Sequence, residues 1–140
     1  MSRLVLDASA AVWLVIPGQP VGPELTDAVE QAELVVVPSM YSSEVANALW
    51  KYVRASELEV SDALAMLDNA LAFADHIVPT DQSLLREALN EACRLRHPVD
   101  DLVYVVVARR LTARLATCDQ RLAQIAGELA VPVIGCQVGE

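Results

Sequence analysis

The chain of 140 residues has no apolar run long enough to cross a membrane. Its longest nearly apolar stretch runs from Ala8 to Ile16, whereas a helix needs roughly 20 such residues to span a bilayer. No cationic segment precedes this stretch and no small-residue cleavage site follows it, so a secretory signal is not expected. We therefore expect a cytoplasmic protein.

Cysteine is scarce as well. Cys93, Cys118 and Cys136 are odd in number and far apart, and the sequence has no Cys-x-x-Cys pair. Neither a disulfide framework nor a zinc site is predicted by such spacing. We expect all three thiols to lie in the core.

Basic residues are few, since 10 Lys and Arg stand against 19 Asp and Glu, which leaves a net charge of −9. A general nucleic-acid binder is usually basic because it gains free energy when counterions are released. The acidic balance argues against that class of protein. It does not argue against a metal-assisted nuclease, in which bound cations supply the positive charge that meets the phosphate.

Apolar residues make up 54% of the chain, and no repeat, low-complexity tract or interdomain linker interrupts them. This composition excludes disorder and predicts one domain over residues 1–140. A mean hydropathy of +0.36 in a short chain also indicates that some apolar surface contacts a partner. We expect self-association.

Short runs typical of strands alternate with helical patterns, which predicts an α/β domain. The runs do not alternate apolar and polar residues, as expected for a parallel sheet covered on both faces. The strands are expected at 4–6, 34–37, 77–78, 115–117 and 131–134, and helices at about 24–32, 39–54, 62–74 and 81–95. Residues 102–111 favour a helix only slightly, because their β-branched content favours a strand.

Two of the expected helix starts carry polar side chains suited to capping. They are Ser61 with Asp62, and Thr80 with Asp81. A third helix is expected to start at Pro23 with Glu24, where a carboxylate favours the first turn.

Two aspartates stand at places where a strand ends and a helix begins. Asp7 follows Leu4–Leu6, and Asp119 follows residues 115–118. Ligands of open α/β sheets bind at the carboxyl ends of strands, so both side chains are candidates for a site. Both positions also suit a helix N-cap, and the spacing alone leaves the two roles open.

Three further acids are candidates. Glu44 lies on the second turn of the helix expected over 39–54, and Asp100 and Asp101 precede the most apolar run of the second half. Singly, each suits a solvated charge at a helix start. Four carboxylates in one cleft would repel one another and raise their pKa values, and divalent cations between them would relieve that repulsion. Mg²⁺ suits such a site because it takes carboxylate oxygens and keeps several waters.

Four segments, in this order and spacing, resemble the PIN domain family. They are Leu-Val-Leu-Asp-Ala-Ser at Asp7, Ser-Ser-Glu-Val-Ala-Asn-Ala-Leu at Glu44, Asp-Leu-Val-Tyr at Asp101 and Ala-Thr-Cys-Asp-Gln-Arg-Leu at Asp119. More narrowly, the chain resembles the VapC toxins of bacterial type II toxin–antitoxin pairs. The resemblance covers nearly the whole chain.

This resemblance implies a PIN-like three-layer sandwich with a central five-stranded parallel sheet between helices, and it makes residues 102–111 a helix. It implies an endoribonuclease that depends on Mg²⁺ or Mn²⁺ and hydrolyses RNA, the metal lowering the pKa of a bound water and neutralising charge on the attacked phosphate. It also implies a homodimer that is held inactive in a complex with a small VapB-type antitoxin.

The resemblance assigns catalytic and metal-binding roles to four acids, Asp7, Glu44, Asp101 and Asp119, with Asp7 and Asp101 as the expected direct ligands. It assigns supporting roles to Ser9, Asn47 and Thr117.

The family usually has one acid before the x-x-Tyr step, and this chain has two. Asp101 fits the spacing to Tyr104, and adjacent helical residues point about 100° apart, so Asp100 is the weaker candidate. The mechanism needs no histidine, and we expect His76 and His97 to be structural or exposed.

Two other functions are compatible with parts of the sequence. A phosphotransfer domain would use Asp7 as nucleophile, but the second acid that such domains often carry two residues later is Ser9 here. The only lysine, Lys51, is also expected far from any late strand end. A catalytically inactive PIN-like interaction module is the other alternative, and the presence of all four acids counts against it.

Overall fold

Five parallel strands form the central sheet of the computed structural model, which describes residues 2–20 and 22–136. In chain order they are β1 (Arg3–Leu6), β2 (Leu34–Pro38), β3 (His76–Val78), β4 (Arg114–Ala116) and β5 (Val133–Ile134). The spatial order is β3-β2-β1-β4-β5, and every neighbouring pair is parallel. The expected α/β class and five-stranded parallel sheet are confirmed.

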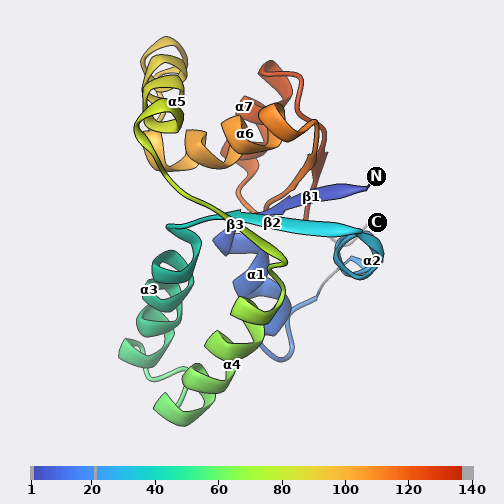
Figure 1. The fold of residues 1–140 in the computed structure, drawn as a ribbon. Coiled ribbons are helices and arrows are strands. Elements are labelled where there is room, and N and C mark those ends of the chain that lie inside the picture. The colour runs from blue at the N-terminus through green and yellow to red at the C-terminus, as the bar shows by residue number, and fades with distance from the viewer. Residues whose placement is uncertain (1, 21, 137–140) are drawn as a thin grey trace.

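Helices cover both faces of the sheet. The described residues form α1 (Ala8–Val15), α2 (Pro23–Gln31), α3 (Tyr41–Arg54), α4 (Val60–Ala72), α5 (Gln82–Leu95), α6 (Val99–Leu111) and α7 (Gln120–Glu128). Figure 1 shows α1, α3 and α4 on one side of the strands and α5, α6 and α7 on the other, which makes three layers. In the described ranges, no helix combines the length and the apolar character needed to span a membrane.

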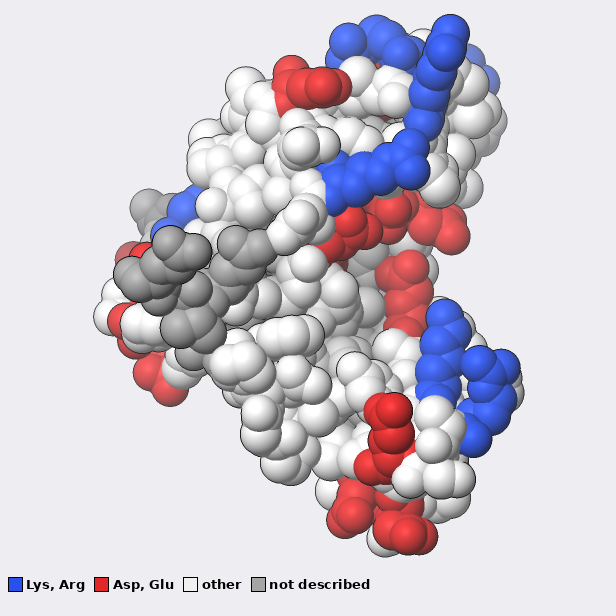
Figure 2. Space-filling model, turned by 180° about the vertical axis from the view of Figure 1, so that it is seen from behind, with Lys and Arg blue, Asp and Glu red and all other residues white. Residues whose placement is uncertain are grey.

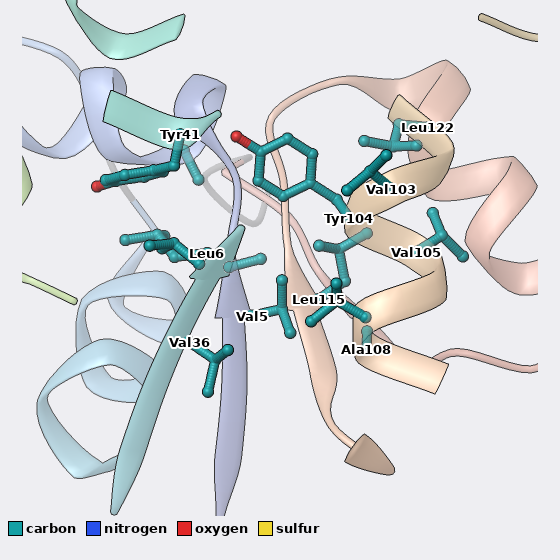
Figure 3. Packing of buried hydrophobic residues seen from close by; sticks show 14 of the residues in the cluster. Val5, Leu6, Val36, Tyr41, Val103, Tyr104, Val105, Ala108, Leu115 and Leu122 are labelled. Carbon is teal, nitrogen blue, oxygen red and sulfur yellow. The ribbon is translucent and has the colours of Figure 1, made fainter. Parts of the chain in front are cut away.

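The core lies where α6 packs on the central strands. Residues 102–108 of α6 are all buried, and Figure 3 shows Ala108 of this helix beside Leu115 of the sheet. A helix that is apolar all round belongs in the interior, and burial here overrides the strand preference of its β-branched residues. The helix implied for residues 102–111 is therefore confirmed.

One expected helix start is wrong. The helix α4 already begins at Val60, so Ser61 and Asp62 lie within its first turn and neither caps it. A carboxylate in the first turn still interacts favourably with the helix dipole, which explains the signal in the sequence. At α5 the expected aspartate does cap the helix, because Asp81 accepts a hydrogen bond from the backbone N–H of Leu84.

The expectation of three core thiols is also wrong. Cys93 is exposed on α5, and Cys118 and Cys136 form a disulfide. These two residues are 18 positions apart, but they follow β4 and β5, which are neighbouring parallel strands. Their proximity therefore comes from strand order, which cysteine spacing alone does not reveal.

The disulfide generates a prediction about stability. Reduction is expected to lower the free energy of unfolding by about 3 kcal/mol, because a crosslink that closes a loop of this length restricts the unfolded chain. Cys136→Ser should have the same effect, and Cys93→Ser is the matched control that should have none. Urea unfolding with and without dithiothreitol measures the difference. Three reactive thiols in the denatured, unreduced protein would contradict the disulfide.

Candidate active site

Four carboxylates line one open pocket at the carboxyl ends of the central strands. The pocket has a volume of about 280 Å³ and is lined by Asp7, Ala8, Ser9, Glu44, Asn47, Ala48, Lys51, Asp101, Tyr104 and Asp119. In Figure 2, acidic side chains gather in a recess at one edge of the molecular surface. This is the edge of an open α/β sheet where ligands bind.

Asp7 is both a helix cap and a pocket residue. Its Oδ1 accepts hydrogen bonds from the Ala10 backbone N–H at 2.9 Å and from the Ser9 hydroxyl at 2.7 Å, and its Oδ2 accepts one from the Thr117 hydroxyl. The residue is only 4% exposed. The two roles that the spacing left open are thus compatible, because the cap bond orients the carboxylate at the pocket.

Burial raises the pKa of Asp7 from 3.8 to about 6, since the ionised carboxylate loses most of its contact with water. The three hydrogen bonds that it accepts favour the ionised form and oppose this shift without cancelling it. The charge of Asp101 raises the pKa further. Asp7 is therefore a carboxylate held ionised, at neutral pH, against the preference of its surroundings.

Glu44 and Tyr104 connect the two helical layers across the pocket. The helix α3 begins at Tyr41, so Glu44 lies in its first turn. The sequence pattern predicts the second turn because it starts the helix two residues earlier, at Ser39. The Tyr104 hydroxyl donates a hydrogen bond to Oε1 of Glu44, and Figure 3 shows this hydroxyl pointing away from α6. Burial raises the pKa of Glu44, and the tyrosine hydrogen bond opposes that shift.

Asp101 is oriented by a histidine that no sequence pattern indicated. Nε2 of His97, which lies between α5 and α6 four residues before Asp101, is 2.7 Å from Oδ2 of Asp101, and the His97 side chain is only 3% exposed. Its buried Nδ1 has no partner among the described residues. A buried N–H without an acceptor is costly, so we place the ring proton on Nε2, where it is donated to Asp101. His97 is structural, as expected, but it acts on a residue of the site.

Asp119 is the N-cap of α7, and its Oδ1 accepts hydrogen bonds from the backbone N–H groups of Arg121 and Leu122. Two hydroxyls connect it to Asp7. Oγ1 of Thr117 accepts a hydrogen bond from the backbone N–H of Asp119, and Oγ of Ser9 accepts one from the backbone N–H after Thr117. The two strand ends are therefore held together by the supporting hydroxyls.

The remaining candidate residues differ in whether they line the pocket. Asn47 is exposed and lines the pocket, whereas Thr117 is buried beneath it. Asp100 is exposed and does not line the pocket, although its charge raises the pKa of Glu44. The structure therefore brings the four acids of the sequence prediction to one place, and their catalytic roles stay predictions.

The chemistry of the pocket fits a hard divalent cation. No three His, Cys, Asp or Glu side chains in the described part of the chain are grouped closely enough to hold a metal among themselves. Mg²⁺, however, is usually held by one or two carboxylates and keeps several waters. The charges of Asp7 and Asp101 both raise the pKa of Glu44, a repulsion that a cation relieves. The residues present thus fit Mg²⁺ or Mn²⁺.

Lys51 is a pocket residue that the sequence analysis missed. It was expected far from any late strand end, yet it lines the same pocket as Asp119, which follows β4. A signal was present, because Glu44, Asn47 and Lys51 are spaced by three and then four residues. Such spacing places side chains on one face of a helix.

Comparisons with known proteins agree with this fold. A model of the PIN domain matches residues 4–128. The chain is 31% identical over 131 residues to Ribonuclease VapC3 of Pyrobaculum aerophilum, which covers 93% of this chain and 99% of that protein. Among solved structures, it resembles PAE2754 from Pyrobaculum aerophilum (TM-score 0.71, 22% identity, 89% of this chain and 79% of that one). It also resembles VapBC2 from Rickettsia felis, solved with a promoter DNA fragment (TM-score 0.68, 13% identity, 96% and 99%).

The raised pKa of Asp7 predicts an unusual pH dependence. Its folded pKa of about 6 exceeds the unfolded value of 3.8, so ionised Asp7 destabilises the metal-free fold at neutral pH. Asp7→Asn keeps the acceptor for Ala10 and carries no charge. At pH 7 it is expected to be more stable than wild type by on the order of 1–3 kcal/mol, a gain that disappears as the pH falls through 6 toward 4.

Urea unfolding in EDTA at several pH values measures this difference. The matched control is Asp68→Asn, which neutralises an exposed carboxylate on α4 and should leave the pH dependence unchanged. An Asp7→Asn variant whose stability parallels that of wild type from pH 4 to 7 would contradict the buried, ionised carboxylate.

The contact between His97 and Asp101 predicts an effect on metal affinity. His97→Leu removes the hydrogen bond to Oδ2 and should weaken Mn²⁺ binding by about 10-fold or more, as loss of a ligand's outer partner does. His97→Gln retains an N–H donor and should recover part of the loss. Titration calorimetry with Mn²⁺ gives the affinities, and circular dichroism checks folding. A folded Leu variant that binds Mn²⁺ as tightly as wild type would show that His97 does not orient Asp101.

Proposed function

Because the chain belongs to the PIN domain family, we propose that it is a metal-dependent endoribonuclease and the toxin of a VapBC-type toxin–antitoxin pair. The observation that carries this proposal is the pocket that four carboxylates share at the end of the sheet. It occurs in a chain related over nearly its whole length to a protein named a ribonuclease. The substrate in this proposal is RNA, and the reaction is hydrolysis of a phosphodiester bond.

In the proposed site, Asp7 and Asp101 bind Mg²⁺ or Mn²⁺ directly, and Glu44 and Asp119 complete the acidic set. The cation, when bound, activates a water and neutralises charge on the attacked phosphate. The chain's own groups prepare the ligands. Hydrogen bonds engage one oxygen each of Glu44 and Asp101, which leaves the other oxygen of each side chain available to the pocket.

We also propose a homodimer and a complex with an antitoxin of the VapB type. The neighbour from Rickettsia felis was solved as VapBC2, which supports the class of partner. The surface of this chain offers apolar side chains for such contacts, among them Val60, Leu64, Leu71, Ile77, Leu85 and Leu89. Burying exposed apolar area of this kind favours association.

The phosphotransfer alternative is less well supported. The place of Lys51 in the pocket removes one argument against it. Two others remain, because Ser9 stands where the second acid of such a domain would be and the PIN model spans residues 4–128.

The first test is cleavage of a mixed RNA pool by the purified protein in Mg²⁺, in Mn²⁺ and in EDTA. We expect products only with metal, and a loss of at least about 100-fold in Asp7→Asn and Asp101→Asn, more than loss of an outer hydrogen-bond partner costs. The matched control is Asp100→Asn, which removes the adjacent exposed carboxylate and should cleave nearly as well as wild type. Because Asp7→Asn is expected to be more stable than wild type, its loss of activity would not reflect unfolding.

Two outcomes would overturn parts of the proposal. Metal-dependent cleavage that persists in both variants would exclude these acids as the metal ligands. No cleavage by the folded, antitoxin-free protein would favour the inactive interaction module.

A further inference from the structure

Basic residues of the first 80 positions are concentrated beside the pocket. This half of the chain has 11 acids and three bases, Arg3, Lys51 and Arg54. Arg3 opens β1 at the end of the sheet opposite the pocket, where its side chain donates a hydrogen bond to the Leu111 carbonyl. The other two bases lie on the last turns of α3, and Lys51 lines the pocket. Two of the three bases thus lie on the helix that carries Glu44, and one of them lines the acidic pocket.

Asn47, Lys51 and Arg54, which we term the α3 stripe, continue the pocket along this helix. Counted from Glu44 they follow at positions three, seven and ten, so they occupy successive turns on one side of α3. All three residues are exposed, and neither base forms an ion pair with any described residue. The guanidinium of Arg54 lies 4.7 Å from the ring centroid of Trp50, which is 51% exposed.

Several arginines of the second half are engaged elsewhere. Arg94 and Arg109 form ion pairs with Glu91, and Arg109 and Arg110 form ion pairs with Glu87. The pairs of Arg109 and Arg110 join α6 to α5, whereas the pair of Arg94 lies within α5, and together they offset much of the positive charge of these arginines. They leave Lys51 and Arg54 among the unpaired bases of the described chain, and Lys51 as the one Lys or Arg that lines the pocket.

If the substrate is a polyanion, Lys51 and Arg54 can offset the repulsion between the substrate and this acidic protein. A chain of net charge −9 with four acids in one recess repels a phosphate backbone, and a bound cation acts only at the phosphate that is attacked. Flanking phosphates need their own positive partners. In Figure 2, basic side chains stand on both sides of the acidic recess. Lysine and arginine beside an exposed aromatic ring are the groups with which proteins hold single-stranded nucleic acid.

We propose that the α3 stripe binds the RNA backbone on one side of the bond that is cut, with Lys51 and Arg54 contacting phosphates that flank the attacked one. This inference rests on the proposed function and adds to it the direction in which the strand leaves the pocket, along α3 toward its carboxyl end. The exposed ring of Trp50, beside Arg54, offers a face for a base of the same strand.

Salt-dependent binding tests this directly. A fluorescent 12-nucleotide single-stranded RNA is titrated with protein in the inactive Asp7→Asn background, at several KCl concentrations. Lys51→Gln and Arg54→Gln are each expected to raise Kd by about 3- to 10-fold at low salt and to reduce the slope of log K against log salt by about 0.7, the value for one lost single-strand phosphate contact. Lys51→Arg retains the charge and should retain most of the affinity.

The matched control is Arg114→Gln, which removes the same charge from an exposed arginine at the start of β4, at the opposite end of the sheet. It should change neither Kd nor the slope. In the otherwise wild-type protein, the two stripe variants should raise KM for RNA several-fold with kcat changed by less than about 2-fold, because the acids that hold the metal are untouched.

The outcomes separate this inference from the proposed function. If wild type cleaves RNA but the stripe variants match Arg114→Gln in Kd and slope, the α3 stripe does not bind RNA and the proposed function stands. If wild type neither binds nor cleaves RNA, the proposed function is wrong. Stripe variants that bind RNA normally but lose affinity for a poly-glutamate peptide would assign the stripe to an acidic protein partner instead.

Discussion

The carboxylate of Asp7 lies at the end of the central strand, almost without contact with water, and the rest of the site is arranged around it. Burial there favours the neutral acid, while two hydroxyls and one backbone N–H favour the carboxylate. Two of those donors follow β1 and the third, Thr117, follows the neighbouring strand β4. The hydrogen bonds that stabilise the charge therefore also join the two strand ends. A divalent cation in the pocket would act in the same direction as these donors and complete their effect.

The same principle recurs at the other acids, each of which is held by a group of its own. Glu44 is held by a buried tyrosine from the opposite layer, and Asp101 by a buried histidine four residues before it. Asp119 is held by the first backbone N–H groups of α7. Oriented carboxylates lose less entropy when they bind a cation, and they cannot swing away from one another to reduce their repulsion. The fold thus maintains a charge arrangement that is unfavourable in the metal-free protein.

Sequence patterns predicted the parts of this arrangement that depend on local chemistry. The apolar runs predicted the parallel sheet, and the strand-end positions of Asp7 and Asp119 predicted which side chains lie at its edge. Residues 102–111 required the family resemblance, because their propensity conflicts with a burial that only the packed sheet provides. The Cys118–Cys136 pair and the contact of Tyr104 with Glu44 depend on neighbours distant in sequence. His97 precedes Asp101 by four residues, but a lone histidine carries no signal until its burial is known.

Because the net charge of the protein is negative, binding a polyanion requires basic side chains placed next to the pocket. The recess concentrates negative charge, and the only Lys or Arg that lines it in the described structure is Lys51. Arg109 and Arg110 of α6 form ion pairs with glutamates of α5, partly exposed pairs whose contribution to stability is small. Their principal effect is to remove positive charge from that surface. An RNA strand approaching the pocket therefore meets unpaired positive charge along α3, so a few well-placed side chains, and not the net charge, decide where a polyanion is held.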